Sequence, residues 1–118
     1  MLNIYTSQIL EGKNVIDVSL HNGLYIFKPY KDYYKNANAV MVNEMELKDL
    51  LKPYLNQMRQ SYDKNTELWT WLLNRKTIIL GCDCGHMDKL CHAQFLAQRI
   101  FSKLTETKYF GWIRTINN

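Results

Sequence analysis

A chain of 118 residues is long enough for one compact domain and leaves no room for a second ordinary one, so we predict a single domain over residues 1–118. Apolar residues make up 47% and charged residues 22%, a balance typical of soluble globular proteins that excludes extensive disorder. The 15 lysines and arginines outnumber the 11 aspartates and glutamates and give a net charge of +4. This charge permits an anionic partner, but it also keeps a small domain soluble.

No targeting or membrane segment is expected. The N-terminal residues lack a basic start followed by a long apolar run, and no stretch approaches the roughly 18 apolar residues that cross a bilayer. All three cysteines lie between Cys82 and Cys91, whereas a secreted disulfide scaffold spreads its cysteines along the chain. We therefore expect reduced thiols, a cytoplasmic location and no membrane partner.

Two strands are predicted near the N-terminus, over residues 2–9 and 15–20, because both segments are rich in β-branched and apolar residues. Residues 24–35 are ambiguous, since their first part favours an extended chain while KDYYKN could begin a short helix. The tyrosines and lysines of residues 25–35 are typical of a surface that binds single-stranded nucleic acid, or of a half-buried segment with solvated lysines. We favour the second alternative, in which the tyrosines pack against the domain.

A helical period begins after Asn43, which is predicted as the N-cap. The inward face of this helix comprises Leu47, Leu50, Leu51, Tyr54 and Met58. Pro53 predicts a kink or two short helices, because proline removes a backbone donor.

A further helix is predicted for TELWTWLLNRK, with Leu68, Trp71 and Leu72 inward. Trp69 and Trp71 point about 200° apart on a helix, so at most one of them is deeply buried.

The clearest local pattern begins at residues 77–80, an apolar β-branched run typical of a strand buried on both faces. A loop follows, and then a helix with an apolar stripe formed by Ala93, Leu96, Ala97, Ile100 and Leu104. Tyr109 to Trp112 form either a last strand or a docking segment. Strand, loop and helix in this order predict an α/β fold with a mainly parallel sheet of about four strands flanked by helices.

The loop concentrates sulfur and imidazole groups: Cys82, Cys84, His86, Cys91 and His92. A zinc site is one interpretation, with three cysteines and either His86 or His92 as the four ligands. The spacing is unfavourable, because Cys82 and Cys84 flank one residue and adjacent Cys91 and His92 would point about 100° apart on a helix.

A second interpretation is a reactive or ligand-binding loop. Cys91 lies where the helix should begin, and the helix dipole would lower the pKa of its thiol. Cys91 and His92 are then the candidate catalytic residues, Cys84 and His86 contact a ligand, and the helix start holds an anion such as a nucleotide phosphate. A third interpretation is structural, with Cys82 a buried hydrophobe and His92 a helix cap or a donor to a buried carbonyl.

The segment TIILGCDCGHMDKLCH, residues 77–92, resembles the carboxyl-terminal signature of the bacterial and phage family called domain of unknown function 488. That signature is an apolar strand, Cys-x-Cys, a short loop and Cys-His-Arg opening a helix. FKPYKDYYKN (27–36) and residues 54–80 are also similar to the family, and the related domain of unknown function 4326 family has a similar Cys/His pattern.

The resemblance implies a small Rossmann-like domain with a site around the cysteines and His92, to which Arg59, Ser61 and Tyr62 contribute. It also makes a phage protein in a host cytoplasm plausible. The chain departs from the family at Ala93, where the signature has arginine; Arg99, Lys89 or backbone groups would have to replace that arginine in any anion site.

Three functions follow as hypotheses. The first is a binder of a small anionic or nucleotide-like ligand, or a small enzyme acting on one. The second is a zinc-stabilised module. The third is a non-enzymatic phage-type protein that binds a host protein or nucleic acid.

Overall fold

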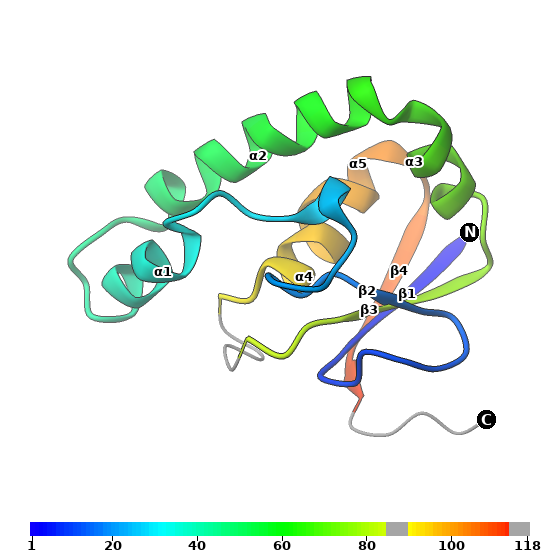
Figure 1. Ribbon diagram of the computed structural model, residues 1–118, viewed down its shortest axis with the longest axis horizontal. Coiled ribbons are helices and arrows are strands. Elements are labelled where there is room, and N and C mark those ends of the chain that lie inside the picture. The colour runs from blue at the N-terminus through cyan, green and yellow to red at the C-terminus, as the bar shows by residue number, and fades with distance from the viewer. Residues whose placement is uncertain (85–89, 114–118) are drawn as a thin grey trace.

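Four parallel strands form the sheet of the computed structural model, which describes residues 1–84 and 90–113. The strands are β1 (Leu2–Ser7), β2 (Val15–Asp17), β3 (Thr77–Gly81) and β4 (Thr107–Ile113), in the order β2-β3-β1-β4. Figure 1 shows the helices gathered on one side of this sheet. The predicted α/β fold with a parallel sheet of four strands is confirmed, and it is consistent with a small Rossmann-like domain.

Between β2 and β3 the chain forms a 3-10 turn and three helices: η1 (Tyr25–Phe27), α1 (Tyr33–Met41), α2 (Leu47–Lys64) and α3 (Thr66–Leu73). Between β3 and β4 it forms one helical run, composed of α4 (His92–Phe95), the π-helical segment η2 (Leu96–Phe101) and α5 (Ser102–Leu104). No helix in the part of the chain that the structure describes is long and apolar enough to span a membrane.

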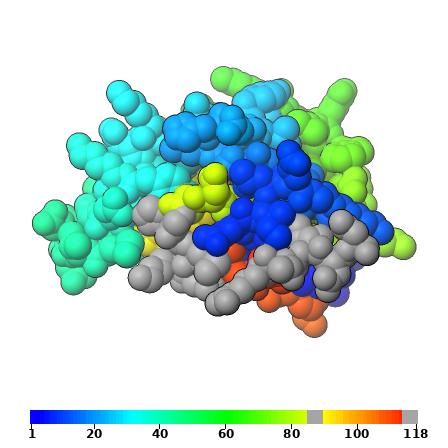
Figure 2. Space-filling view, turned by 60° about the horizontal axis from the view of Figure 1, so that its bottom comes forward, coloured from blue at the N-terminus to red at the C-terminus, as the bar shows by residue number. Residues whose placement is uncertain are grey.

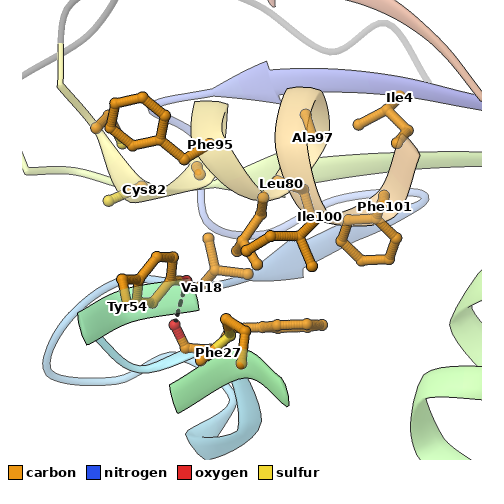
Figure 3. Packing of buried hydrophobic residues seen from close by; sticks show 14 of the residues in the cluster. Ile4, Val18, Phe27, Tyr54, Leu80, Cys82, Phe95, Ala97, Ile100 and Phe101 are labelled. Carbon is orange, nitrogen blue, oxygen red and sulfur yellow. Dashed lines mark hydrogen bonds between the residues drawn. The ribbon is translucent and has the colours of Figure 1, made fainter. Parts of the chain in front are cut away.

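The core lies between the sheet and the helices. Figure 3 shows Ile4 and Leu80 of the sheet beside Ala97 and Phe101 of the last helical run, with Phe27 on the opposite side of these residues. The predicted stripe of that run is buried as far as Ile100, but Leu104 is 38% exposed because the helix ends there.

A short connection, residues 8–14, links β1 to β2 although β3 lies between them. It returns along the sheet, where the Ile79 amide donates to the Asn14 carbonyl at 2.9 Å. Gly81 allows this path, since a Cβ atom there would lie 2.3 Å from the Ile9 carbonyl oxygen. The missing side chain at Gly81 thus lets the connection cross the end of β3 closely.

Several predicted boundaries are wrong. The first two strands end at Ser7 and Asp17, short of the predicted residues 9 and 20. Strand β2 stops because the Asp17 side chain accepts a hydrogen bond from the Ser19 amide at 2.9 Å, which turns the chain. The ambiguous region from residue 24 contains η1 and the start of α1, and the tail forms β4.

The predicted start of α2 is also wrong. Asn43 follows α1 with a φ of 62°, and Glu46 is the N-cap of α2. Leu47, predicted inward, is 37% exposed in the first turn. Helix α2 continues through Pro53 as one helix, so the predicted alternative of two short helices is wrong. Pro53 and Asp49, whose carbonyl loses its amide partner, both lie on the exposed side of the helix, where water can replace the bond.

Helix α3 buries Trp69 and leaves Trp71 54% exposed, which reverses the predicted choice of Trp71 as the inward residue. The Trp69 ring packs edge-on against Phe27 at 4.8 Å between ring centroids, and its Nε1–H donates to the Ser61 hydroxyl at 3.2 Å. Trp71 instead lies beneath the guanidinium of Arg75, 4.7 Å from the ring centroid. That at most one of the two tryptophans is deeply buried is confirmed.

Candidate metal centre

The three cysteines converge at the carboxyl end of β3. Cys82 directly follows this strand, Cys84 lies two residues further on, and Cys91 is the N-cap of α4. Their Sγ atoms all lie within 4.8 Å of one another. Cys82 and Cys91 are buried and Cys84 is half-buried. Figure 3 shows Cys82 at the end of the core, close to Phe95.

Cys84 marks the outer side of the cluster. Figure 2 shows the chain near residues 80–84 reaching the surface between the dark-blue N-terminal part and the cyan helix α1. The cluster therefore has a buried side at Cys82 and Cys91 and a side towards solvent at Cys84.

His92 lies beside the thiols and is completely buried. Its Nε2 bonds to the Val18 carbonyl oxygen at 2.5 Å, and because a carbonyl only accepts, Nε2 carries the proton. Burial lowers the pKa of the imidazole, so the ring is neutral and Nδ1 presents a lone pair. Nδ1 accepts a hydrogen bond from the Tyr34 hydroxyl and lies 3.9 Å from the Sγ of Cys82.

Tyr34 is the site residue that the sequence did not identify. It comes from α1, and its hydroxyl oxygen lies 3.8 Å from the Sγ of Cys82 and 3.9 Å from that of Cys91. The sequence indicated only that the tyrosines of residues 25–35 pack against the domain. That packing is found at Tyr33, which is buried, and at Tyr34, which is half-buried.

The thiols of Cys82 and Cys91 are protonated in the absence of a cation. Hydrogen bonding with Cys84 raises the pKa of Cys82 to about 12, and hydrogen bonding with Cys82 and Cys84, together with burial, raises the pKa of Cys91 above its usual range. The predicted lowering of the Cys91 pKa by the helix start is therefore wrong. Thiols that share a buried site oppose one another's ionisation, and a cation among them would remove that opposition.

The sequence argued against Cys91 and His92 binding the same zinc ion, because adjacent helical side chains point about 100° apart. The structure removes this objection. As the N-cap, Cys91 has an extended backbone (φ −65°, ψ 133°) and lies outside the helix, so the angle between neighbouring helical side chains does not apply. The Sγ of Cys91 lies within 4.8 Å of the Sγ of Cys82, and the Nδ1 of His92 lies 3.9 Å from the same sulfur. Because neither residue has exposed surface, neither offers the open thiol or imidazole that the catalytic interpretation requires in this conformation.

Three other predicted site residues, Arg59, Ser61 and Tyr62, lie on α2. His86 and Lys89 fall outside the described residues. Arg59 and Tyr62 line a groove beside Trp69, and the Ser61 hydroxyl donates to the Ile26 carbonyl at 2.7 Å. The contacts that the structure shows for these three α2 residues are with the groove and the core, and the cysteine cluster is not among them.

Fold and site together define a small parallel α/β domain with a Cys/His cluster at the junction of a strand and a helix that could hold a metal ion such as zinc. Comparison with family models, with curated proteins and with solved structures found no match to this chain. The resemblance to the domain of unknown function 488 family stays a prediction.

Proposed function

We propose that this chain is a zinc-stabilised module whose ion is held by Cys82, Cys84, Cys91 and His92. The observation that carries the proposal is the convergence of three thiols within 4.8 Å. Zinc–sulfur bonds of about 2.3 Å in a tetrahedron place sulfur atoms roughly 3.8 Å apart. Adjustments of about an ångström at most would bring the thiolates to that spacing.

His92 is oriented as a fourth ligand would be. Metal-binding histidines commonly donate the remote ring N–H to a backbone carbonyl, which fixes the tautomer, and His92 donates to Val18 in this way. Zinc bonds of about 2.0 Å to nitrogen and about 2.3 Å to sulfur in a tetrahedron imply roughly 3.5 Å between the two ligand atoms. The observed 3.9 Å between the Nδ1 of His92 and the Sγ of Cys82 is close to that value.

Tyr34 supports the same proposal from outside the ligand set. Its hydroxyl now donates to the Nδ1 of His92. Once Nδ1 binds the ion, this hydroxyl is near enough to turn towards the thiolate of Cys82 or Cys91. Such outer hydrogen bonds commonly orient zinc ligands and hold their charge.

The burial of three of the four proposed ligands favours a structural ion over a catalytic one. A catalytic zinc keeps a coordination position open to substrate, whereas Cys82, Cys91 and His92 are at most 1% exposed. We place the module in the cytoplasm, of a host cell if the chain is a phage protein as the family resemblance implies, because thiolate ligands need a reducing environment.

The test is metal content and its dependence on the ligands. The protein is purified with a reducing agent, and zinc is measured by elemental analysis before and after treatment with a chelator. We expect about one zinc ion per chain, and a lower melting temperature after chelation. The metal-free chain should still fold at 25 °C, because most of the core lies away from the cluster.

Cys82→Ser and His92→Gln should each reduce the bound zinc by at least tenfold at limiting metal. His21→Gln is the matched control, since His21 is an exposed histidine outside the cluster, and should retain the wild-type zinc content. Absence of zinc in the wild-type protein, both as purified and after incubation with zinc, would refute the proposal. A retained binding stoichiometry in Cys82→Ser together with Cys91→Ser would do the same.

A further inference from the structure

A groove beside α2 is the second place where the structure gathers groups suited to a ligand. It has a volume of about 390 Å³, within the range of about 300–1,000 Å³ found for small-molecule sites. One wall comes from α2 and the start of α3, and the other from the end of η2 and α5. Its apolar and aromatic lining consists of Leu55, Met58, Tyr62, Trp69, Ile100 and Leu104.

Cations surround this apolar lining. Arg59 from α2 and Arg99 and Lys103 from the opposite wall contribute three positive charges, and Asp63 contributes one negative charge, a local balance of 3 − 1 = +2. Within residues 1–84 and 90–113 the structure shows one ion pair, Lys48 with Glu46, which lies at the other end of α2. Within the described residues, neither guanidinium group of the groove is therefore in an ion pair with a carboxylate.

The backbone of one wall is also unusual. Arg99 and Ile100 belong to the π-helical segment η2 inside an otherwise α-helical run. Segments of π-helix are rare, cost backbone hydrogen-bond geometry and occur frequently at functional sites. Here the segment faces Trp69 across the core, where the ring centroids of Trp69 and Phe101 lie 5.5 Å apart.

From these features we propose that the groove binds an organic carboxylate with an apolar body, such as a medium-chain alkyl carboxylate. The body lies on the aromatic and aliphatic lining, and the carboxylate lies between Arg59 and Arg99. Guanidinium groups pair with carboxylates through two parallel hydrogen bonds, which gives this end of the ligand its orientation. The site is independent of the metal, so zinc binding and ligand binding succeed or fail separately.

Calorimetric titration of the protein as purified with sodium decanoate, below its micelle concentration, tests the proposal. Decanoate should bind saturably at one site per chain. Acetate lacks the apolar body and decanol lacks the charge, so each should bind at least tenfold more weakly or not measurably.

Arg59→Gln and Arg99→Gln should each weaken decanoate binding by about tenfold, the effect expected for the loss of one charge-assisted hydrogen bond. Lys52→Gln removes a positive charge from an exposed position of α2 outside the groove and should leave the affinity within twofold. Leu104→Glu places a carboxylate in the lining and should abolish binding.

Three results would overturn the proposal. The first is the absence of saturable decanoate binding. The second is binding of acetate or inorganic phosphate as tight as that of decanoate, which would indicate attraction of any anion. A dimer seen by sedimentation and lost in Leu104→Glu would indicate that a second copy of the chain covers the groove.

Discussion

The hydrogen bond between Tyr34 and His92 gives the sharpest test of the cluster geometry. Tyr34→Phe removes the hydroxyl but keeps the ring, which makes edge contacts with Tyr33 at 4.9 Å and with His92 at 5.7 Å between centroids. The change removes the hydroxyl donor of the buried Nδ1 of His92 and leaves only the weak thiol of Cys82 at 3.9 Å. An unsatisfied buried acceptor costs about 1–3 kcal/mol, so we expect a loss of about 2 kcal/mol in the metal-free protein.

That free energy converts to a shift in melting temperature. An unfolding entropy of about 2.1 cal/mol/K per residue over 118 residues gives about 0.25 kcal/mol/K, so 2 kcal/mol lowers the melting temperature by about 8 °C. The assay is thermal unfolding followed by circular dichroism, with chelator and reducing agent present. Tyr25→Phe is the matched control, because its exposed hydroxyl donates to Asn65 at 2.9 Å, and it should cost under about 0.5 kcal/mol.

A double-mutant cycle separates this hydrogen bond from general effects of the substitution. In a His92→Leu background the imidazole acceptor is gone and the Tyr34 hydroxyl keeps only weak contacts with the Cys82 and Cys91 sulfurs, so Tyr34→Phe should cost under about 0.5 kcal/mol. If Tyr34→Phe has the same cost in both backgrounds, or no cost in the wild-type background, then the hydrogen bond from Tyr34 to His92 does not contribute to stability.

Three further expectations concern the core, the sheet and the thiols. Trp69→Ala should destabilise the protein by about 3–5 kcal/mol in denaturant unfolding, because Trp69 is fully buried. Trp71→Ala should cost under about 1 kcal/mol, because Trp71 is exposed. Equal costs would contradict the assignment of Trp69 to the buried face of α3. Gly81→Ala should lower the melting temperature, because the new methyl group would overlap the Ile9 carbonyl, and an unchanged value would show that the 8–14 connection does not cross β3 so closely. In the metal-free protein iodoacetamide should modify half-buried Cys84 before Cys82 and Cys91, as followed by peptide mass spectrometry, and bound zinc should slow all three reactions; faster modification of Cys91 would contradict its burial.

The strand-loop-helix unit around the cysteines was predictable because its signals are local. The β-branched run of residues 77–80 and the stripe from Ala93 to Ile100 each fix one element, and a helix start at Cys91 follows from them. The three thiols could then be placed at one end of a buried strand. Their convergence within a few ångströms could not, because it depends on the path of the loop.

The remaining features of the site depend on contacts between distant segments. Tyr34 meets His92 across 58 residues, and Val18 meets it across 74, so no local pattern indicates either partner. The choice between Trp69 and Trp71 has the same origin. Either tryptophan can belong to an apolar face of α3. The ring contacts with Phe27 and Phe101, which come from other elements, determine that Trp69 is the buried one.

The position of the cluster also explains why a metal would act on the fold as a whole. Strand β2 has three residues, and the 8–14 connection that leads into it has no helix, so this side of the sheet has few backbone interactions of its own. The Val18 carbonyl at the end of β2 accepts from His92 of α4, and Tyr34 brings α1 to the same imidazole. An ion that fixes His92 together with the thiols after β3 would therefore hold β2, β3, α1 and α4 in one arrangement. Such an ion would stabilise the short edge strand β2, which is the contribution expected of a structural metal.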